Sequence, residues 1–106
     1  MRQSLSGRTP GELVDVWPFA DPPNTAAITT RPVLEQSAPI LRVVHDADDG
    51  TWQFLCGTTG DPAEARVVGL GRMGTRDASL RELADLPEGW HAWRAGVGAP
   101  WQRGPA

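Results

Sequence analysis

The chain of 106 residues contains no lysine and only one cysteine, Cys56. A single cysteine excludes an internal disulfide, so the cysteine content gives no sign of secretion. The sequence also lacks any apolar run near the ~20 residues that a membrane span requires, and its first residues lack the continuous apolar segment of a secretion signal. We therefore expect a cytoplasmic protein with no membrane partner.

Basic charge is also scarce. All ten basic residues are arginines that stand singly along the chain, and the formal net charge is −3. A surface that binds nucleic acid needs clustered cations to displace the counterions of the phosphates. The charge balance therefore argues against nucleic acid as a partner.

The most regular pattern in the sequence is a β-hairpin signature between residues 40 and 56. Two apolar segments flank an Asp-Asp-Gly reversal at residues 48–50, and glycine supplies the positive φ that a tight reversal requires. The second segment places Trp52 and Phe54 on one face. These two rings are expected to fill the core.

Other segments predict further strands and little helix. Glycine and proline are frequent, with 12 and 10 residues, so turns are many and long helices few. Thr30 is placed to cap a helical turn, and Ser79 with Glu82 forms a capping box ahead of a helix. The expected strands are 26–29, 40–45, 51–56, 65–70 and 90–94, and the expected helical segments are 31–36 and 79–86.

These elements define an α+β fold in one domain. Its mainly antiparallel sheet is expected to have four to six strands, with one clear helix near 79–86. A chain of this length buries roughly 60–68% of its unfolded surface, enough for one core without metals or disulfides. We expect a poorly defined N-terminal segment at 1–16, the domain at 17–101 and a flexible tail at 102–106.

No motif carries catalytic or metal-binding chemistry. His45 and His91 are the only histidines, and the sequence has no Cys-x₂-Cys pair to join them in a zinc site. Cys56 follows Phe54 by two residues on the same strand face, which favours a buried, inert thiol over a nucleophile. The sequence therefore predicts a protein that is not an enzyme and that uses no metal or cofactor.

The acidic reversal and two tryptophans are the candidate contact residues. Asp46, Asp48 and Asp49 do not fit a calcium loop, because its sixth and twelfth positions lack the required Gly and Glu. They favour a solvated turn or, alternatively, an acidic patch that attracts a basic protein. Trp93 and Trp101 are candidate anchors for that partner, since tryptophan is enriched at binding hot spots. The alternative for Trp101 is that it folds back over a sheet edge.

Three elements of the sequence resemble a known family. They are Gly50–Phe54 (GTWQF) in the hairpin, Asp77–Leu80 (DASL) before the helix and Pro87–Trp90 (PEGW) before the last strand. With the order of strands around them, the span 24–94 resembles a family of small bacterial proteins of unknown function. That family is grouped with predicted immunity proteins of polymorphic toxin systems. The resemblance implies a protein that neutralises a toxin by masking it, and it implies no catalytic residue.

The sequence leaves three functions open. The first, which we expect, is a non-catalytic, immunity-like module that binds a basic, toxin-like protein. The second is a small-molecule-binding domain or small enzyme with a pocket lined by Arg42, His91 and Arg94. The third is an accessory domain that forms a homodimer through its exposed sheet edges.

Overall fold

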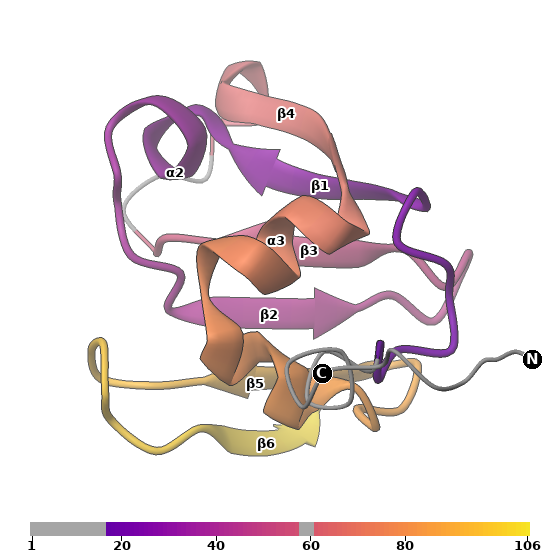
Figure 1. The fold of residues 1–106 in the computed structure, drawn as a ribbon. Helices are drawn as coiled ribbons and strands as arrows, with labels where there is room; N and C mark the ends of the chain where they lie inside the picture. The colour runs from indigo at the N-terminus through magenta and orange to yellow at the C-terminus, as the bar shows by residue number, and fades with distance from the viewer. Residues whose placement is uncertain (1–16, 58–60) are drawn as a thin grey trace, which may run out of the picture.

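A computed structural model describes residues 17–57 and 61–106 and contains one six-stranded sheet with helices packed on it (Figure 1). The strand order is β4-β1-β3-β2-β5-β6, and only the β1–β3 pair is parallel. The α+β class is confirmed, with a mixed sheet. The prediction for residues 1–16 lies outside the described residues. The strands are β1 (Ala26–Thr30), β2 (Arg42–His45), β3 (Trp52–Leu55), β4 (Ala65–Gly69), β5 (Trp90–Trp93) and β6 (Gln102–Pro105).

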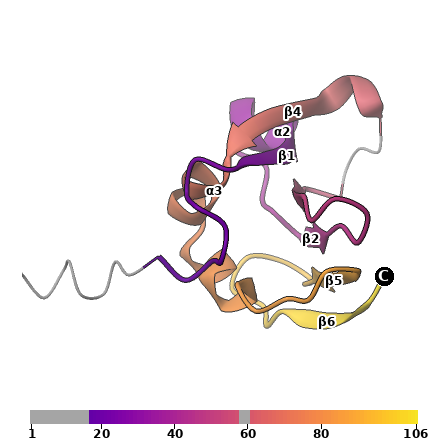
Figure 2. The ribbon, with the colours of Figure 1, turned by 90° about the vertical axis from the view of Figure 1, so that its right-hand side faces the viewer.

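The helices gather mainly on one side of the sheet. Helix α3 and the 3₁₀ helix η2 lie across one face of the strands (Figure 1), and the turned view places α3 to one side of them (Figure 2). Helix α2 follows β1 without a gap. The helices in the described part of the chain are α2 (Arg31–Glu35), η1 (Pro62–Glu64), α3 (Leu70–Arg76) and η2 (Ala78–Leu83).

The β2–β3 hairpin forms where the sequence predicts it. Its register pairs His45 with Trp52. Gly50 has a φ of +72°, a left-handed value that glycine adopts at little cost. Strand β1 then lies parallel to β3, although the two are separated along the chain by α2 and β2.

Helix α2 also begins where predicted. The hydroxyl oxygen of Thr30 accepts a hydrogen bond from the Val33 amide at 3.5 Å, and Pro32 stands in the first turn. Proline is tolerated there because the first amides of a helix have no acceptor within the helix. The local sequence is therefore sufficient to start this helix.

The helix predicted near 79–86 takes a different form. Residues Ala78–Leu83 form the 3₁₀ helix η2, and its cap is the carboxylate of Asp77, which accepts from the Ser79 amide at 3.0 Å. The Ser79 hydroxyl donates to the same carboxylate at 2.8 Å, so the predicted capping box does not form. The seven-residue helix α3 lies just before η2, in a segment with no helix predicted.

The segment predicted as a flexible tail at 102–106 instead forms an edge strand. Strand β6 pairs antiparallel with β5, with Gln102 opposite Trp93. The Ala106 amide donates to the Gly89 carbonyl at 2.8 Å. Glycine and proline make this segment unlike an ordinary strand, but an edge position tolerates both.

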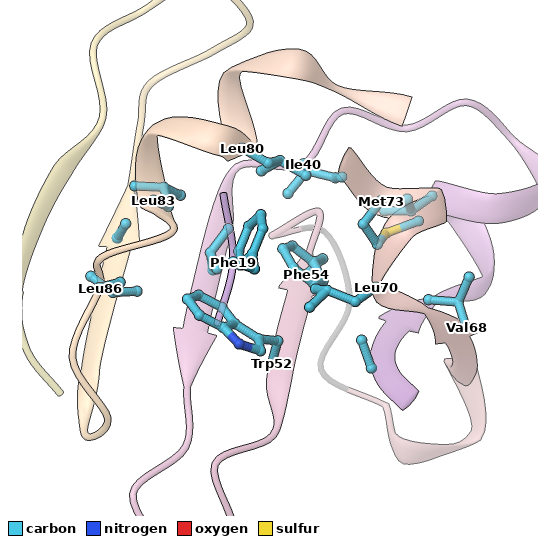
Figure 3. Close-up of a cluster of buried hydrophobic side chains, with 14 of the residues drawn as sticks. Phe19, Ile40, Trp52, Phe54, Val68, Leu70, Met73, Leu80, Leu83 and Leu86 are labelled. Carbon is cyan, nitrogen blue, oxygen red and sulfur yellow. The ribbon is translucent and has the colours of Figure 1, made fainter. Parts of the chain in front are cut away.

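The core fills the space between the sheet and the α3–η2 side (Figure 3). Trp52 and Phe54 are 3% and 1% exposed, and Cys56 is fully buried, as the sequence predicts. Phe19 packs edge-on against Trp52 with ring centroids 5.1 Å apart, a favourable aromatic geometry. The other buried apolar residues are Ala27, Val33, Ile40, Val43, Val68, Leu70, Met73, Leu80, Leu83, Leu86 and Ala92.

Candidate functional site

The sheet face turned away from α3 and η2 presents a continuous row of side chains. These residues alternate with the core residues of their strands, so they point to the opposite face. Val67 is 71% exposed and its neighbours in the row are partly exposed. Among the described residues, no helix packs on this face, which we call the uncovered face, and exposed apolar groups on such a face are typical of an interaction site. The strand register aligns Val67, Ile28, Gln53, Val44 and His91 in this row.

Arg42, His91 and Trp93 lie together at one end of this face. Trp93 is opposite Arg42 in the β2–β5 pair. The Nε of Arg42 donates to Nδ1 of His91 at 3.4 Å, and the rings of His91 and Trp93 have centroids 4.8 Å apart. Trp93 is 39% exposed, so a partner can reach its ring.

The acidic turn lies at the other end of the same strands. Asp48 and Asp49 are exposed, and Asp46 accepts a hydrogen bond from the Gln53 amide at 3.5 Å, which joins the turn to the uncovered face. Hydrogen bonds from the backbone and side chain of Thr51 lower the pKa of Asp49. Within residues 17–57 and 61–106 none of the three carboxylates forms an ion pair. The turn therefore carries concentrated, unneutralised negative charge.

Arg94 occupies the opposite side of the sheet, with its side chain only 2% exposed. Its Nη2 donates to the Asp77 carboxylate at 2.6 Å and to the Ile40 carbonyl at 2.8 Å. Its Nε donates to the same carbonyl at 3.0 Å, and Nη1 donates to the Ser79 hydroxyl at 3.1 Å. A buried guanidinium requires such partners, because an unpaired buried charge is strongly destabilising.

The carboxylate of Asp77 is held in its charged form. Burial by itself raises its pKa, but hydrogen bonds from Ser79 and Arg94 outweigh burial and hold the pKa of Asp77 below its ordinary value. The Ser79 hydroxyl donates to Asp77 while it accepts from Arg94 and from Nε1 of Trp101. An oxygen with these three contacts is a poor nucleophile, because both of its lone pairs are engaged.

Trp101 folds back onto this network and does not share a surface with Trp93. The guanidinium carbon of Arg94 lies 4.4 Å from the centroid of the Trp101 ring, a cation–π contact. The indole Nε1 donates to Ser79 at 3.1 Å. The two candidate anchors are therefore on different sides of the sheet, and Trp93 is the more accessible one.

Two hollows accompany these features. One of about 470 Å³ is bounded by Arg94, by the η2 residues Ser79 and Glu82, and by the loop 97–101. The other, of about 230 Å³, lies on the uncovered face against Leu55 and its neighbours in β1 and β3. The first hollow has the size of a small-ligand site.

The pocket predicted from Arg42, His91 and Arg94 is not assembled. Arg94 follows His91 by three residues, and residues at odd spacing in a strand face opposite sides. Arg42 and His91 meet on the uncovered face, while Arg94 turns into the Asp77 network. The alternation of side chains along a strand already predicts, from the sequence alone, that His91 and Arg94 lie on opposite faces. The sequence assigns Glu82 to a capping box, and only the fold places it with Arg94 in the lining of the larger hollow.

His45 has a structural environment, away from any site of this kind. It stacks on Trp52 with ring centroids 3.9 Å apart, and its Nδ1 is 2.7 Å from the Leu86 carbonyl oxygen. Across residues 17–57 and 61–106, no three His, Cys, Asp or Glu side chains gather as they do around a metal ion. The same ranges hold no helix with the length and apolar character of a membrane span.

Comparison with protein-family models, curated proteins and solved structures gave no match to this chain. The geometry and chemistry of the site itself are therefore the basis for any functional assignment.

Proposed function

We propose that this protein is a non-catalytic protein-binding module that receives a basic partner on the uncovered face of its sheet. The observation that carries the proposal is the position of accessible Trp93 and Val67 on a face that also borders the acidic turn. Exposed tryptophan supplies large contact area at small entropic cost, which makes it a frequent hot spot. An apolar centre with charge at its rim is the usual anatomy of a protein interface.

The charge of the turn sets the chemistry of the partner. Asp46, Asp48 and Asp49 place three carboxylates in four residues, and the Glu88 carboxylate lies near Gly50 at the same end of the sheet. Such a patch attracts basic proteins over a Debye length and raises their association rate. At the other end, Arg42 favours an acceptor group on the partner. The fitting partner therefore carries basic residues against the turn and an acceptor near Trp93.

An immunity-like role agrees with this surface. The resemblance of residues 24–94 to predicted immunity proteins suggests that the basic partner is a toxin, neutralised when its active surface is masked. A bare sheet face suits this task, because masking needs contact area and charge complementarity and no catalytic group. In this proposal the activity belongs to the partner, and this chain contributes affinity and selectivity.

The test begins with capture of partners from native lysate at low salt, followed by affinity measurement with the purified partner. We expect Trp93→Ala to weaken binding by about tenfold or more, as for an interface hot spot. Replacing Asp46, Asp48 and Asp49 with Asn keeps their hydrogen-bond acceptors and should slow association by about tenfold at low salt. Glu82→Gln, on the other side of the sheet, is the matched control and should leave the affinity unchanged.

Three results would contradict the proposal. The first is unchanged binding in both the Trp93 and the acidic-turn variants, which would remove the uncovered face from the interaction. The second is affinity that does not fall between low and high salt, which would remove charge steering. The third is capture of further copies of this chain alone, which would favour the homodimer in place of a basic partner.

A further inference from the structure

We propose that the hollow of about 470 Å³ beside Arg94 is a separate binding site for a small organic cation, of the primary alkylammonium class. It lies on the α3–η2 side of the sheet, away from the face assigned to the protein partner. Its polar lining is Asp77, Ser79, Glu82 and Arg94, and its apolar lining comes mainly from Val97, Pro100 and Trp101. The site is independent of the proposed protein-binding function.

The charge of the lining selects a cation. Arg94 borders the hollow, but Asp77 neutralises it at 2.6 Å, and four of its five N–H donors are already engaged. An anion would therefore find at most one Nη1 hydrogen, on a guanidinium whose charge is already paired and whose side chain is only 2% exposed. The carboxylate of Glu82 is exposed and makes no ion pair in the described part of the chain. The Glu82 carboxylate is therefore the one negative charge in the lining that no cation of the lining neutralises.

The walls select an alkyl stem attached to that cation. Val97 is 75% exposed, and Pro100 and the half-buried Trp101 continue the apolar lining. An alkylammonium buries its carbon chain on such a surface while its charged head stays near a carboxylate and water. A metal ion is a poorer fit, because the described residues supply no third carboxylate, His or Cys to the cluster.

The hollow is formed before a ligand arrives. Trp101 is fixed by its hydrogen bond to Ser79 and by its stacking on Arg94. The loop before it is closed by a turn in which the Ala99 amide donates to the Gly96 carbonyl at 3.1 Å. A small ligand gains affinity from such preorganisation, because little protein entropy is lost on binding.

The test is a titration of the full chain with n-butylammonium chloride, followed by amide and indole NMR resonances. We expect saturable shifts confined to residues 77–82 and 97–101 and to the Trp101 indole. Butan-1-ol matches the stem without the charge, and sodium chloride matches the ionic strength. Neither should reproduce these shifts. Glu82→Gln should weaken binding about fivefold, the scale of one partly exposed charge contact.

Two controls keep the result specific. Glu88→Gln removes an exposed carboxylate elsewhere, and it should leave butylammonium affinity unchanged. The Trp101 indole resonance of the free Glu82→Gln variant should have the same chemical shift as in wild type, which would show that the variant keeps its fold. Equal affinity in Glu82→Gln, identical shifts with butan-1-ol, or shifts centred on Asp46–Asp49 would each overturn the proposal. Because the acidic turn is not involved, these outcomes are independent of partner binding on the other face.

Discussion

At the scale of single residues, Arg94 has the greatest structural consequence. Its side chain joins the end of β5 to Ile40, to Ser79 and to Asp77 through four donor–acceptor contacts. Removing one member of a buried charge pair leaves the other member without its partner, which costs about 3–5 kcal/mol. Arg94 is therefore a stabilising residue that also shapes the neighbouring hollow.

We predict that Arg94→Met lowers the free energy of unfolding by about 3 kcal/mol, measured by urea denaturation. Arg72→Met is the matched control, because Arg72 is exposed on α3 and should change stability by less than about 0.5 kcal/mol. An equal free energy of unfolding for Arg94→Met and Arg72→Met would show that the Arg94 hydrogen bonds do not stabilise the fold. The m-value should stay constant, since the surface exposed on unfolding is nearly the same.

Asp77 gives the same network a dependence on pH. Its folded pKa lies below its unfolded value, because hydrogen bonds from Ser79 and Arg94 outweigh burial. The folded state therefore binds the proton less tightly than the unfolded chain. The stabilisation is complete above the unfolded pKa, about 3.9, and is lost as pH falls through the folded pKa.

We predict that Asp77→Asn flattens the acid limb of the stability curve. Wild type should lose Tm steeply as pH falls below about 4, whereas the variant starts from a lower Tm at pH 7 and loses less. Thermal unfolding at a series of pH values between 7 and 2.5 measures the difference. Parallel curves for the two proteins would show that another carboxyl governs acid unfolding.

At the scale of elements, helix α3 contains two glycines, Gly71 and Gly74, with different surroundings. A Cβ at Gly74 would meet the Trp17 ring at 3.4 Å, an ordinary contact. A Cβ at Gly71 would meet Pro23 at 3.0 Å from its Cβ and 3.2 Å from its carbonyl oxygen, tighter than most Cβ contacts in proteins, so Pro23 would have to shift by a few tenths of an ångström. Packing therefore disfavours a side chain at Gly71 and accepts one at Gly74.

The same substitution should therefore have opposite effects at the two positions. Gly74→Ala should stabilise the protein by about 0.5–1 kcal/mol, because alanine costs less backbone entropy in a helix. Gly71→Ala should destabilise it by about 1 kcal/mol or more, because α3 or the Pro23 segment must move. Urea unfolding of both variants measures the effects, and a shared sign would show that packing does not decide between them.

The same glycines explain which elements the sequence could predict. Strands β1 to β5 and helix α2 carry local signals, such as the Asp-Asp-Gly reversal and the Thr30 cap. Helix α3 was missed because Gly71 and Gly74 interrupt its pattern, and helix propensity is overridden here by packing. The capping box at Ser79 does not form because Asp77, two residues earlier, caps η2 itself. The Ser79 hydroxyl also binds Arg94 and Trp101, and these two contacts exist only in the folded chain.

At the scale of the whole molecule, the sites depend on pairings between distant segments. The insertion of β1 beside β3 aligns Ile28 with Gln53 and makes the uncovered face continuous. No local pattern specifies that neighbour. Trp93 could be assigned to an exposed face from its alternation with Ala92, whereas Arg94, Asp77 and the hollow required the complete topology.

Strand β6 also depends on the whole molecule. The local sequence of residues 102–106 predicts a flexible tail, but in the fold this segment forms the last strand of the sheet. Arg103 donates to the Asp85 carboxylate at 2.9 Å and to the Glu82 carbonyl at 3.0 Å, which ties β6 to the η2 region. Without β6, strand β5 would become an unpaired edge beside the exposed ring of Trp93. Such edges favour association with other chains.

We predict that deleting residues 102–106 lowers the free energy of unfolding by about 2–4 kcal/mol, from several backbone hydrogen bonds near 1 kcal/mol each. Amide hydrogen exchange should show the loss of protection concentrated in β5, with β1 and β3 still protected. Arg103→Ala is the control, because its ion pair is solvent-exposed on the Asp85 side, and it should change stability by less than about 1 kcal/mol. A truly flexible tail would leave β5 protection unchanged on deletion, so this measurement separates a strand that completes the sheet from a segment that merely follows it.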